Sequence, residues 1–231
     1  MATNEEILAY ADFDLYNQLY PDLQKAYNGD KDKLKDHLLK HGLKEGRTFS
    51  YIYDPKFYVE KYPDVKKAFD KDYIKITNHY FEHGIKEGRQ GSVLFDLNYY
   101  KTNYDDLKKA YGDDTQKFIK HFHDHGMKEG RIASKDFDPK SYKEKNAELK
   151  QQFGDNHKEY FKNYLEVFIR EEEKGKPKED EKVKEEEVKK EEQPVKQDEK
   201  GKGQHHGHGP HGMFPGFPGH GPAHGHFHGH K

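Results

Sequence analysis

The sequence predicts an all-α protein in which four short three-helix repeats are followed by a disordered C-terminal tail. Three observations lead to this prediction. A seven-residue motif recurs every 42 residues, as HGLKEGR, HGIKEGR and HGMKEGR from His41, His83 and His125. Between these motifs, apolar residues recur at spacings of three and four, which is the period of a helix face. Beyond residue 170 the sequence has almost no apolar residues, so this region cannot form a packed core.

Each repeat opens with an aromatic residue followed by aspartate, at Phe13, Tyr53, Phe95 and Phe137. A fixed period of this kind indicates stacked repeats, because no unit buries its own apolar face. The fourth unit has VF and EEE in place of HG and EGR, which is typical of a degenerate cap. The predicted segments are a lead-in (1–11), repeat 1 (12–52), repeat 2 (53–94), repeat 3 (95–136), a degenerate capping repeat 4 (137–170), a disordered charged linker (171–203) and a disordered His/Gly/Pro-rich tail (204–231).

Two helices are predicted in the first half of each repeat. Asp54-Pro55 and Asp138-Pro139 have the form of an N-cap followed by proline at the first helical position. A YPD motif then ends this helix, because proline disfavours helical geometry in the residue before it. The second helix is expected over Leu23–Tyr27, Val65–Phe69, Leu107–Tyr111 and Leu149–Phe153.

A polar turn, such as Asn28-Gly29-Asp30, leads into a longer third helix. Its apolar positions include Phe118 and Phe122 in repeat 3, and Ile74, Tyr80 and Phe81 in repeat 2. A first set of glycines is expected at the left-handed position that ends this helix: Gly42, Gly84 and Gly126. A second set marks a further turn: Gly46, Gly88 and Gly130.

The predicted core is aromatic. Tyrosines recur at helical spacing, so packing in the core or at its rim accounts for them: Tyr16, Tyr20, Tyr27, Tyr58 and Tyr62. An aromatic platform for glycans is the alternative.

The KEGR turn is predicted to be architectural. Its glutamates and arginines are expected to pair within or between neighbouring units and so to set the angle between repeats: Glu45, Glu87, Glu129, Arg47, Arg89 and Arg131. A basic groove for phosphate is the alternative, because arginine favours planar anions.

Three H-x-x-x-H pairs precede these turns: His37 and His41, His79 and His83, and His121 and His125. On a helix the two members share a face, which is the spacing of helical zinc pairs. None has the HExxH sequence of a metalloprotease. The favoured interpretation is structural, with histidine stabilising a helix C-terminus, and a secondary metal site is the alternative.

The last two segments differ in composition. Residues 171–202 contain thirteen acidic and ten basic side chains, which predicts a solvated linker. The tail that follows is rich in glycine, proline and histidine, and its candidate metal ligands are His205, His206, His208, His211, His220, His224, His226, His228 and His230.

Neutral imidazole is a good ligand for Zn, Ni and Cu, and a flexible chain can place several imidazoles around one ion. Such sites should be exchangeable and weaker at low pH, because protons compete with the metal. The alternatives are a low-complexity solubilising tail and a purification tag.

The consensus FDxxYYxxxYPDLKKAYxxxxxxxxxHYxxHGxKEGR, over about residues 12–170, resembles a tandem unit of large bacterial proteins, some with glycosyltransferase or surface-associated domains. The tail is similar to those of metal-storage proteins and metallochaperones. The repeat resemblance identifies a repeat type and implies no single activity.

Composition excludes several functional classes. The formal net charge of -2 gives no basic surface for nucleic acid, and the absence of cysteine excludes thiolate sites. No signal peptide or transmembrane segment is recognised, so a cytoplasmic protein is expected. No motif of a catalytic site is present, so we expect no enzyme.

Two functions remain. The first is buffering or delivery of divalent transition metals through the tail. The second is an interaction scaffold, whose repeats bind a protein, a glycan or a filament. In that case the tail would be a pH-dependent adhesive for anionic surfaces, including peripheral contact with membranes at acidic pH, because protonation of all 17 histidines takes the formal charge to +15.

Overall fold

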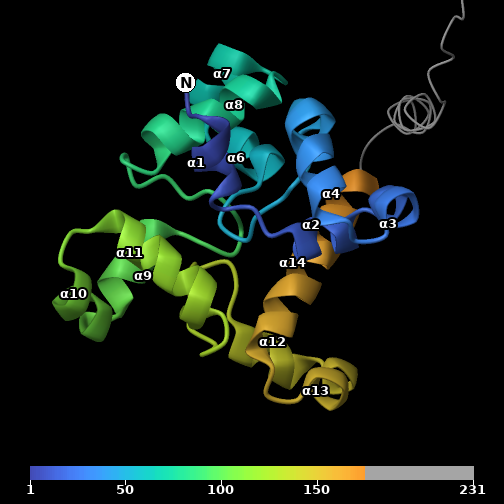
Figure 1. The fold of residues 1–231 in the computed structure, drawn as a ribbon. Coiled ribbons are helices and arrows are strands. Elements are labelled where there is room, and N and C mark those ends of the chain that lie inside the picture. The colour runs from blue at the N-terminus through green and yellow to red at the C-terminus, as the bar shows by residue number, and fades with distance from the viewer. Residues whose placement is uncertain (175–231) are drawn as a thin grey trace, which may run out of the picture. The chain divides into compact units, whose positions relative to one another are not determined.

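The computed structural model describes residues 1–174, which belong to one compact unit (Figure 1). This part of the chain is helical and contains no β-strand, which confirms the predicted fold class. The predicted linker from residue 175 onward and the tail (204–231) lie outside the described residues.

Each repeat contains the three expected helices. In repeat 1 they are α2 (Phe13–Leu19), α3 (Pro21–Tyr27) and α4 (Lys31–His37). In repeat 2 they are α6 (Pro55–Lys61), α7 (Pro63–Phe69) and α8 (Tyr73–His79). Repeat 3 has α9 (Leu97–Asn103), α10 (Asp105–Tyr111) and α11 (Thr115–His121). Repeat 4 has α12 (Pro139–Lys145), α13 (Ala147–Phe153) and α14 (His157–Lys174).

The helix starts follow from local sequence. Asp54 caps α6 by accepting the backbone N–H groups of Lys56 and Phe57, and Pro55 occupies the first helical position, as predicted. The second helices begin two residues earlier than predicted. Proline itself opens α3 and α7, and the extended tyrosine before it ends one helix and precedes the next.

The turn between the second and third helices has a residue of positive φ at the equivalent position of every repeat, and repeat 1 has a second one at Gly29. The φ angles at this position are 46°, 48°, 57° and 56° in Asn28, Asp70, Gly112 and Gly154. Asparagine, aspartate and glycine are the residues that adopt this geometry most readily. An aspartate then caps each of the third helices α4, α8 and α11 through its side chain. The predicted polar turn is confirmed.

The third helices of repeats 1 to 3 end in a π-helical turn: η1 (Leu38–Gly42), η2 (Tyr80–Gly84) and η3 (Phe122–Gly126). The expectation of left-handed geometry at Gly42, Gly84 and Gly126 was wrong. Each of these residues closes its π-helical turn, and Gly42 itself is right-handed (φ -57°). The left-handed positions are Gly46, Gly88 and Gly130, with φ of 65°, 69° and 65°.

The capping repeat differs because it lacks these glycines. Phe168 and Glu172 occupy the positions of the two glycines, and α14 continues without a break to Lys174. Nothing in this stretch requires a turn, so the helix extends through it. Residues 171–174, which the prediction placed in the charged linker, belong to α14.

The core is aromatic, as expected. Its largest fully buried side chains are Tyr16, Tyr51, Tyr53, Tyr58, Tyr80, Tyr100, Tyr160, Phe49, Phe95, Phe118, Phe122 and Phe161. One predicted core position was wrong. Ile74 is 41% exposed, whereas Ile76 is fully buried, because the inward face of α8 includes Ile76 and not Ile74.

The segment before repeat 1 packs onto the array. Helix α1 (Asn4–Leu8) buries Ile7, and Thr3 and Glu6 form a capping box at its start. The Tyr10 ring stacks on Phe81 of repeat 2 with centroids 5.4 Å apart, and its hydroxyl donates a hydrogen bond to Gln116 of repeat 3. The lead-in therefore contacts repeats 2 and 3, which lie far from it in the sequence.

Repeat 4 contacts the first two repeats. The Lys158 ammonium lies 3.2 Å from a carboxylate oxygen of Asp12, and the Phe168 ring packs edge-on against Phe57 with centroids 6.3 Å apart. The four repeats thus make contacts beyond those between sequential neighbours.

Candidate functional site

The described residues contain three histidine pairs and three arginine clusters as candidate sites. The nine tail histidines, His205, His206, His208, His211, His220, His224, His226, His228 and His230, lie outside the described residues. The candidate sites that the structure describes therefore lie in the array.

The first histidine of each pair is bonded to a buried tyrosine. The tyrosine lies on the first helix of the repeat, and the histidine is the last residue of the third helix. The Oη to Nδ1 distances are 3.0, 3.0 and 2.9 Å in the pairs Tyr16–His37, Tyr58–His79 and Tyr100–His121. In the capping repeat, Tyr142 donates the equivalent bond to Asn163 (2.9 Å). This contact was not predicted, although its spacing of 21 residues is the same in every repeat.

The same tyrosines explain the glycines of the π-helical turns. A Cβ added to Gly84 would lie far inside van der Waals contact with the Tyr58 hydroxyl, and Gly42 and Gly126 face Tyr16 and Tyr100 in the same way. These glycines therefore allow close approach of a side chain.

Burial keeps these histidines neutral. Desolvation lowers the pKa of His37, His79 and His121 below its usual value of 6.5, and the nearby arginine of each repeat lowers it further. Burial also raises the pKa of the partner Tyr58, so the phenol stays protonated. At neutral pH the hydrogen bond of each Tyr–His pair therefore joins two uncharged groups.

The second histidine of each pair lies beside the first. Ring centroids are separated by 5.4, 5.6 and 5.5 Å in the pairs His37–His41, His79–His83 and His121–His125. The His83 side chain is 60% exposed. No group of three or more His, Cys, Asp or Glu side chains that could hold a metal ion occurs within residues 1–174.

Each arginine cluster joins the start of the second helix, which reads YPD in repeats 1 and 2 and YDD in repeat 3, to the EGR motif of the same repeat. Arg47 contacts the carboxylates of Asp22 (2.7 Å) and Glu45, and its guanidinium lies over the Tyr20 ring, 4.7 Å from the centroid. Equivalent clusters form around Arg89 with Asp64, Glu87 and Tyr62, and around Arg131 with Asp106, Glu129 and Tyr104.

The carboxylate partners of these arginines lie in the same repeat, which is the intra-unit alternative of the prediction. The cluster holds the start of the second helix against the terminal turn of its own repeat. Arg47, Arg89 and Arg131 are already paired with carboxylates, which leaves little attraction for a phosphate.

The seam between repeats depends on serines that were not predicted. Ser92 donates a 2.7 Å hydrogen bond to the Tyr51 carbonyl, and Ser134 donates a 2.6 Å bond to the Val93 carbonyl. Both serines are fully buried. Their spacing of 42 residues was the signal in the sequence that could have identified them.

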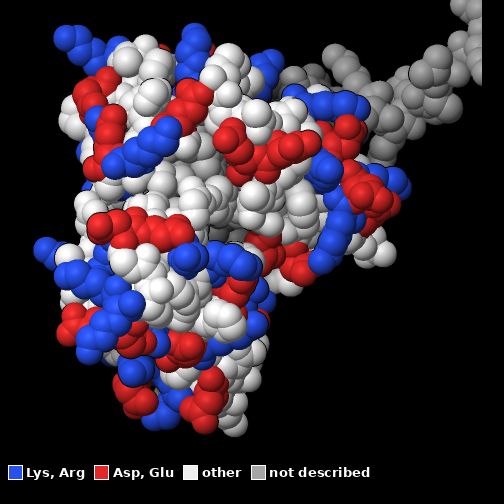
Figure 2. All heavy atoms as spheres, turned by 60° about the vertical axis from the view of Figure 1, so that its left-hand side comes forward, with Lys and Arg blue, Asp and Glu red and all other residues white. Residues whose placement is uncertain are grey.

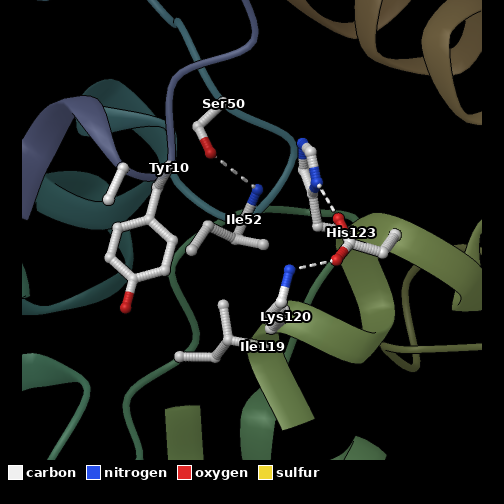
Figure 3. Close-up of a pocket in the computed structure, with 8 residues that line it drawn as sticks. Tyr10, Ser50, Ile52, Ile119, Lys120 and His123 are labelled. Atoms are coloured by element: carbon white, nitrogen blue, oxygen red, sulfur yellow. Dashed lines mark hydrogen bonds and ion pairs between the residues drawn. The ribbon is translucent and has the colours of Figure 1, made fainter. Parts of the chain in front are cut away.

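A small cavity lies where the lead-in meets repeat 3 (Figure 3). Its volume is about 150 Å³, and it is lined by Ala9, Tyr10, Ser50, Ile52, Ile119, Lys120, His123 and Asp124. His123 Nδ1 lies 3.0 Å from Asp124, and the hydrogen bonds from His123 and Lys120 lower the pKa of Asp124 to about 2. The cavity is smaller than most ligand pockets, which begin at roughly 300 Å³.

A second, more polar groove of about 350 Å³ lies between repeats 1 and 4. It is lined by Gln18, Gln24, Gln152, Phe153, Glu159, Lys162, Asn163 and Glu166. Amide, carboxylate and ammonium groups line it, so it can both donate and accept hydrogen bonds.

The visible surface carries mixed charge. Figure 2 shows lysine and arginine side chains interleaved with aspartate and glutamate over the face drawn there, with no broad region of one sign. Of the helices within residues 1–174, none combines the length and apolar character needed to cross a membrane.

Comparison with protein-family models, curated proteins and solved structures found no match to this chain.

Proposed function

We propose that this protein binds divalent transition-metal ions reversibly through its histidine-rich tail, for buffering or delivery, and that the helical array is the folded carrier of that tail. The observation that carries the proposal is the presence of nine histidines among residues 205–231, separated mainly by glycine and proline. Histidine-rich tracts of this composition are typical of metal binding.

The chemistry of the tail favours Zn, Ni and Cu. Imidazole nitrogen suits all three ions, and closely spaced ligands such as His224, His226, His228 and His230 can converge on one ion after closing only short loops. Without cysteine, such sites bind less tightly than thiolate sites and exchange their ions readily. These are properties suited to a buffer.

The small number of metal-binding side chains in each cluster of the array supports this assignment. Its histidine pairs supply two imidazoles each, and no cluster of three metal-binding side chains lies within residues 1–174. Sites with three or four imidazoles would therefore need the tail.

Calorimetry on the full chain tests the proposal. We expect Zn²⁺, Ni²⁺ or Cu²⁺ to bind at micromolar concentrations at pH 7.4 and to bind much more weakly at pH 5.5. A full-length variant with all nine tail histidines changed to asparagine should lose the metal equivalents that the tail binds. The matched control changes Phe214, Phe217 and Phe227 to alanine and should bind as the parent does. The proposal fails if the parent chain binds none of the three ions at pH 7.4.

A second candidate function is an interaction scaffold, and the polar groove between repeats 1 and 4 favours it. In this case the array binds a protein, a glycan or a filament, and the tail adheres to anionic surfaces when protonated. Cosedimentation with phosphatidylserine vesicles at pH 5.5, but not at pH 8, would support this candidate. Equal sedimentation at both pH values, or none, would contradict it.

A further inference from the structure

We infer that repeats 2 and 3 each carry a metal site of their own, in which the pairs His79–His83 and His121–His125 give two imidazole nitrogens to one Cu²⁺, Ni²⁺ or Zn²⁺ ion. This goes beyond the proposed function, because neither site uses the tail.

The spacing of the rings fits a shared ion. A metal–nitrogen bond of about 2.1 Å places the ring centroid roughly 3 Å from the metal, so two imidazoles on one ion have centroids about 5 Å apart. The observed separations are 5.6 Å in repeat 2 and 5.5 Å in repeat 3. Small rotations of the second ring suffice to close the remaining difference.

The tyrosine hydrogen bond orients the first ligand. Tyr58 and Tyr100 hold the Nδ1 atoms of His79 and His121 at 3.0 and 2.9 Å, which leaves Nε2 as the nitrogen for an ion. When Nε2 binds a metal, Nδ1 carries the proton and donates it to the phenol oxygen. Metal-binding histidines almost always have such a partner, which fixes the ring and its tautomer.

The second ligand meets the solvent. His83 is 60% exposed and His125 is also exposed, so an arriving ion can reach them first.

The ligand count sets the choice of metal. Two imidazoles leave the other positions to water, so affinity should follow the general order for nitrogen ligands, with Cu²⁺ binding most tightly. Repeat 1 is left out, because His41 already has a further partner.

The test uses the full-length chain whose nine tail histidines are asparagine. Titration with CuCl₂ at pH 7.5, followed by calorimetry and electron paramagnetic resonance, should show two equivalents with nitrogen hyperfine structure from imidazole. His83→Asn should remove one equivalent and His125→Asn the other. Both substituted residues are exposed, so circular dichroism and Tm without metal should be unchanged.

Two further variants separate a positioned site from chance binding. His123→Asn removes a histidine of the same turn that belongs to neither pair, and copper binding should not change. Tyr58→Phe with Tyr100→Phe should keep both equivalents but weaken their affinity about tenfold or more.

The inference is overturned if the tail variant binds no Cu²⁺ below 100 μM, a ceiling of roughly −5 kcal/mol in binding free energy, or if H83N and H125N leave the stoichiometry unchanged. These results are independent of the tail. The equivalents that are lost with the tail histidines support the proposed function, and the equivalents that survive their loss support the array sites.

Discussion

The histidines of the array have two distinct environments. His37, His79 and His121 are hydrogen-bonded to buried tyrosines, whereas His83 and His125 are exposed. The capping repeat shows that the first position does not require histidine, because Asn163 accepts the equivalent bond from its tyrosine. What histidine adds at this position is a titratable nitrogen.

Titration of this nitrogen should make the array sensitive to acid. The pKa of His37, His79 and His121 is lowered in the folded state, so the unfolded chain binds more protons as the pH falls. The stabilisation is complete above pH 6.5, the unperturbed value, and is lost as the pH falls through the folded pKa. Urea unfolding should therefore give a smaller free energy at pH 5 than at pH 7.5.

The triple variant H37N/H79N/H121N should reduce this dependence, because asparagine can keep the tyrosine bond, as Asn163 does, without titrating. H83N is the control and should keep the parental slope, since the His83 side chain is 60% exposed. Parallel stability curves for the parent and the triple variant, between pH 7.5 and 5, would contradict the assignment.

Within a repeat, the arginine cluster links helices that the YPD break separates. The three clusters have the same partners but differ in burial. The Arg47 side chain is 3% exposed, whereas Arg131 is 21% exposed and its partner Asp106 is 59% exposed. When one partner of a buried ion pair is removed, the other charge stays buried without a partner, which costs much stability. When one partner of an exposed pair is removed, water solvates the remaining charge and the cost is small.

Loss of the buried arginine should therefore be far more harmful. Arg47→Ala leaves the Asp22 and Glu45 carboxylates without their partner and should lower the free energy of unfolding by about 3–5 kcal/mol. Arg131→Ala should lower it by about 1 kcal/mol. Guanidinium unfolding measures both, with exposed Lys128→Ala as the control. Equal losses for R47A and R131A would show that burial does not decide the strength of the cluster.

Within the whole described unit, the lead-in and the repeats make contacts with repeats that are not their neighbours in sequence. The lead-in reaches repeats 2 and 3 through Tyr10, and repeat 4 reaches repeats 1 and 2 through Lys158 and Phe168. A linear array has only neighbour interfaces and can unfold from its ends. These added contacts should make the first and last repeats depend on each other.

Phe168→Ala tests this coupling. Phe168 is half-buried against Phe57, so the loss should be about 2 kcal/mol, below the 3–5 kcal/mol of a fully buried phenylalanine. Hydrogen exchange should increase in α6 as well as in α14, whereas α10 should keep its protection. Val167→Ala, at an exposed neighbouring position, should change stability by under about 0.5 kcal/mol. An increase confined to α14 would mean that the repeats are independent.

The sequence by itself determined the features that depend on near neighbours in the chain. The aspartate caps, the proline helix starts and the polar turns are satisfied within a few residues, so Asp54-Pro55 and the Asn28-Gly29-Asp30 turn could be predicted from sequence. The 42-residue period likewise determined the number of repeats and the aromatic core.

Only the tertiary structure decided which residues meet across helices. The Tyr58–His79 bond, the need for Gly84 beside that hydroxyl, and the seam at Ser92 depend on approaches between segments 21 to 41 residues apart. Side-chain periodicity reports which face of a helix is buried, but not which atom of another helix lies opposite. For that reason the glycine of the π-helical turn was interpreted as a helix end, when its physical role is to make room for a tyrosine.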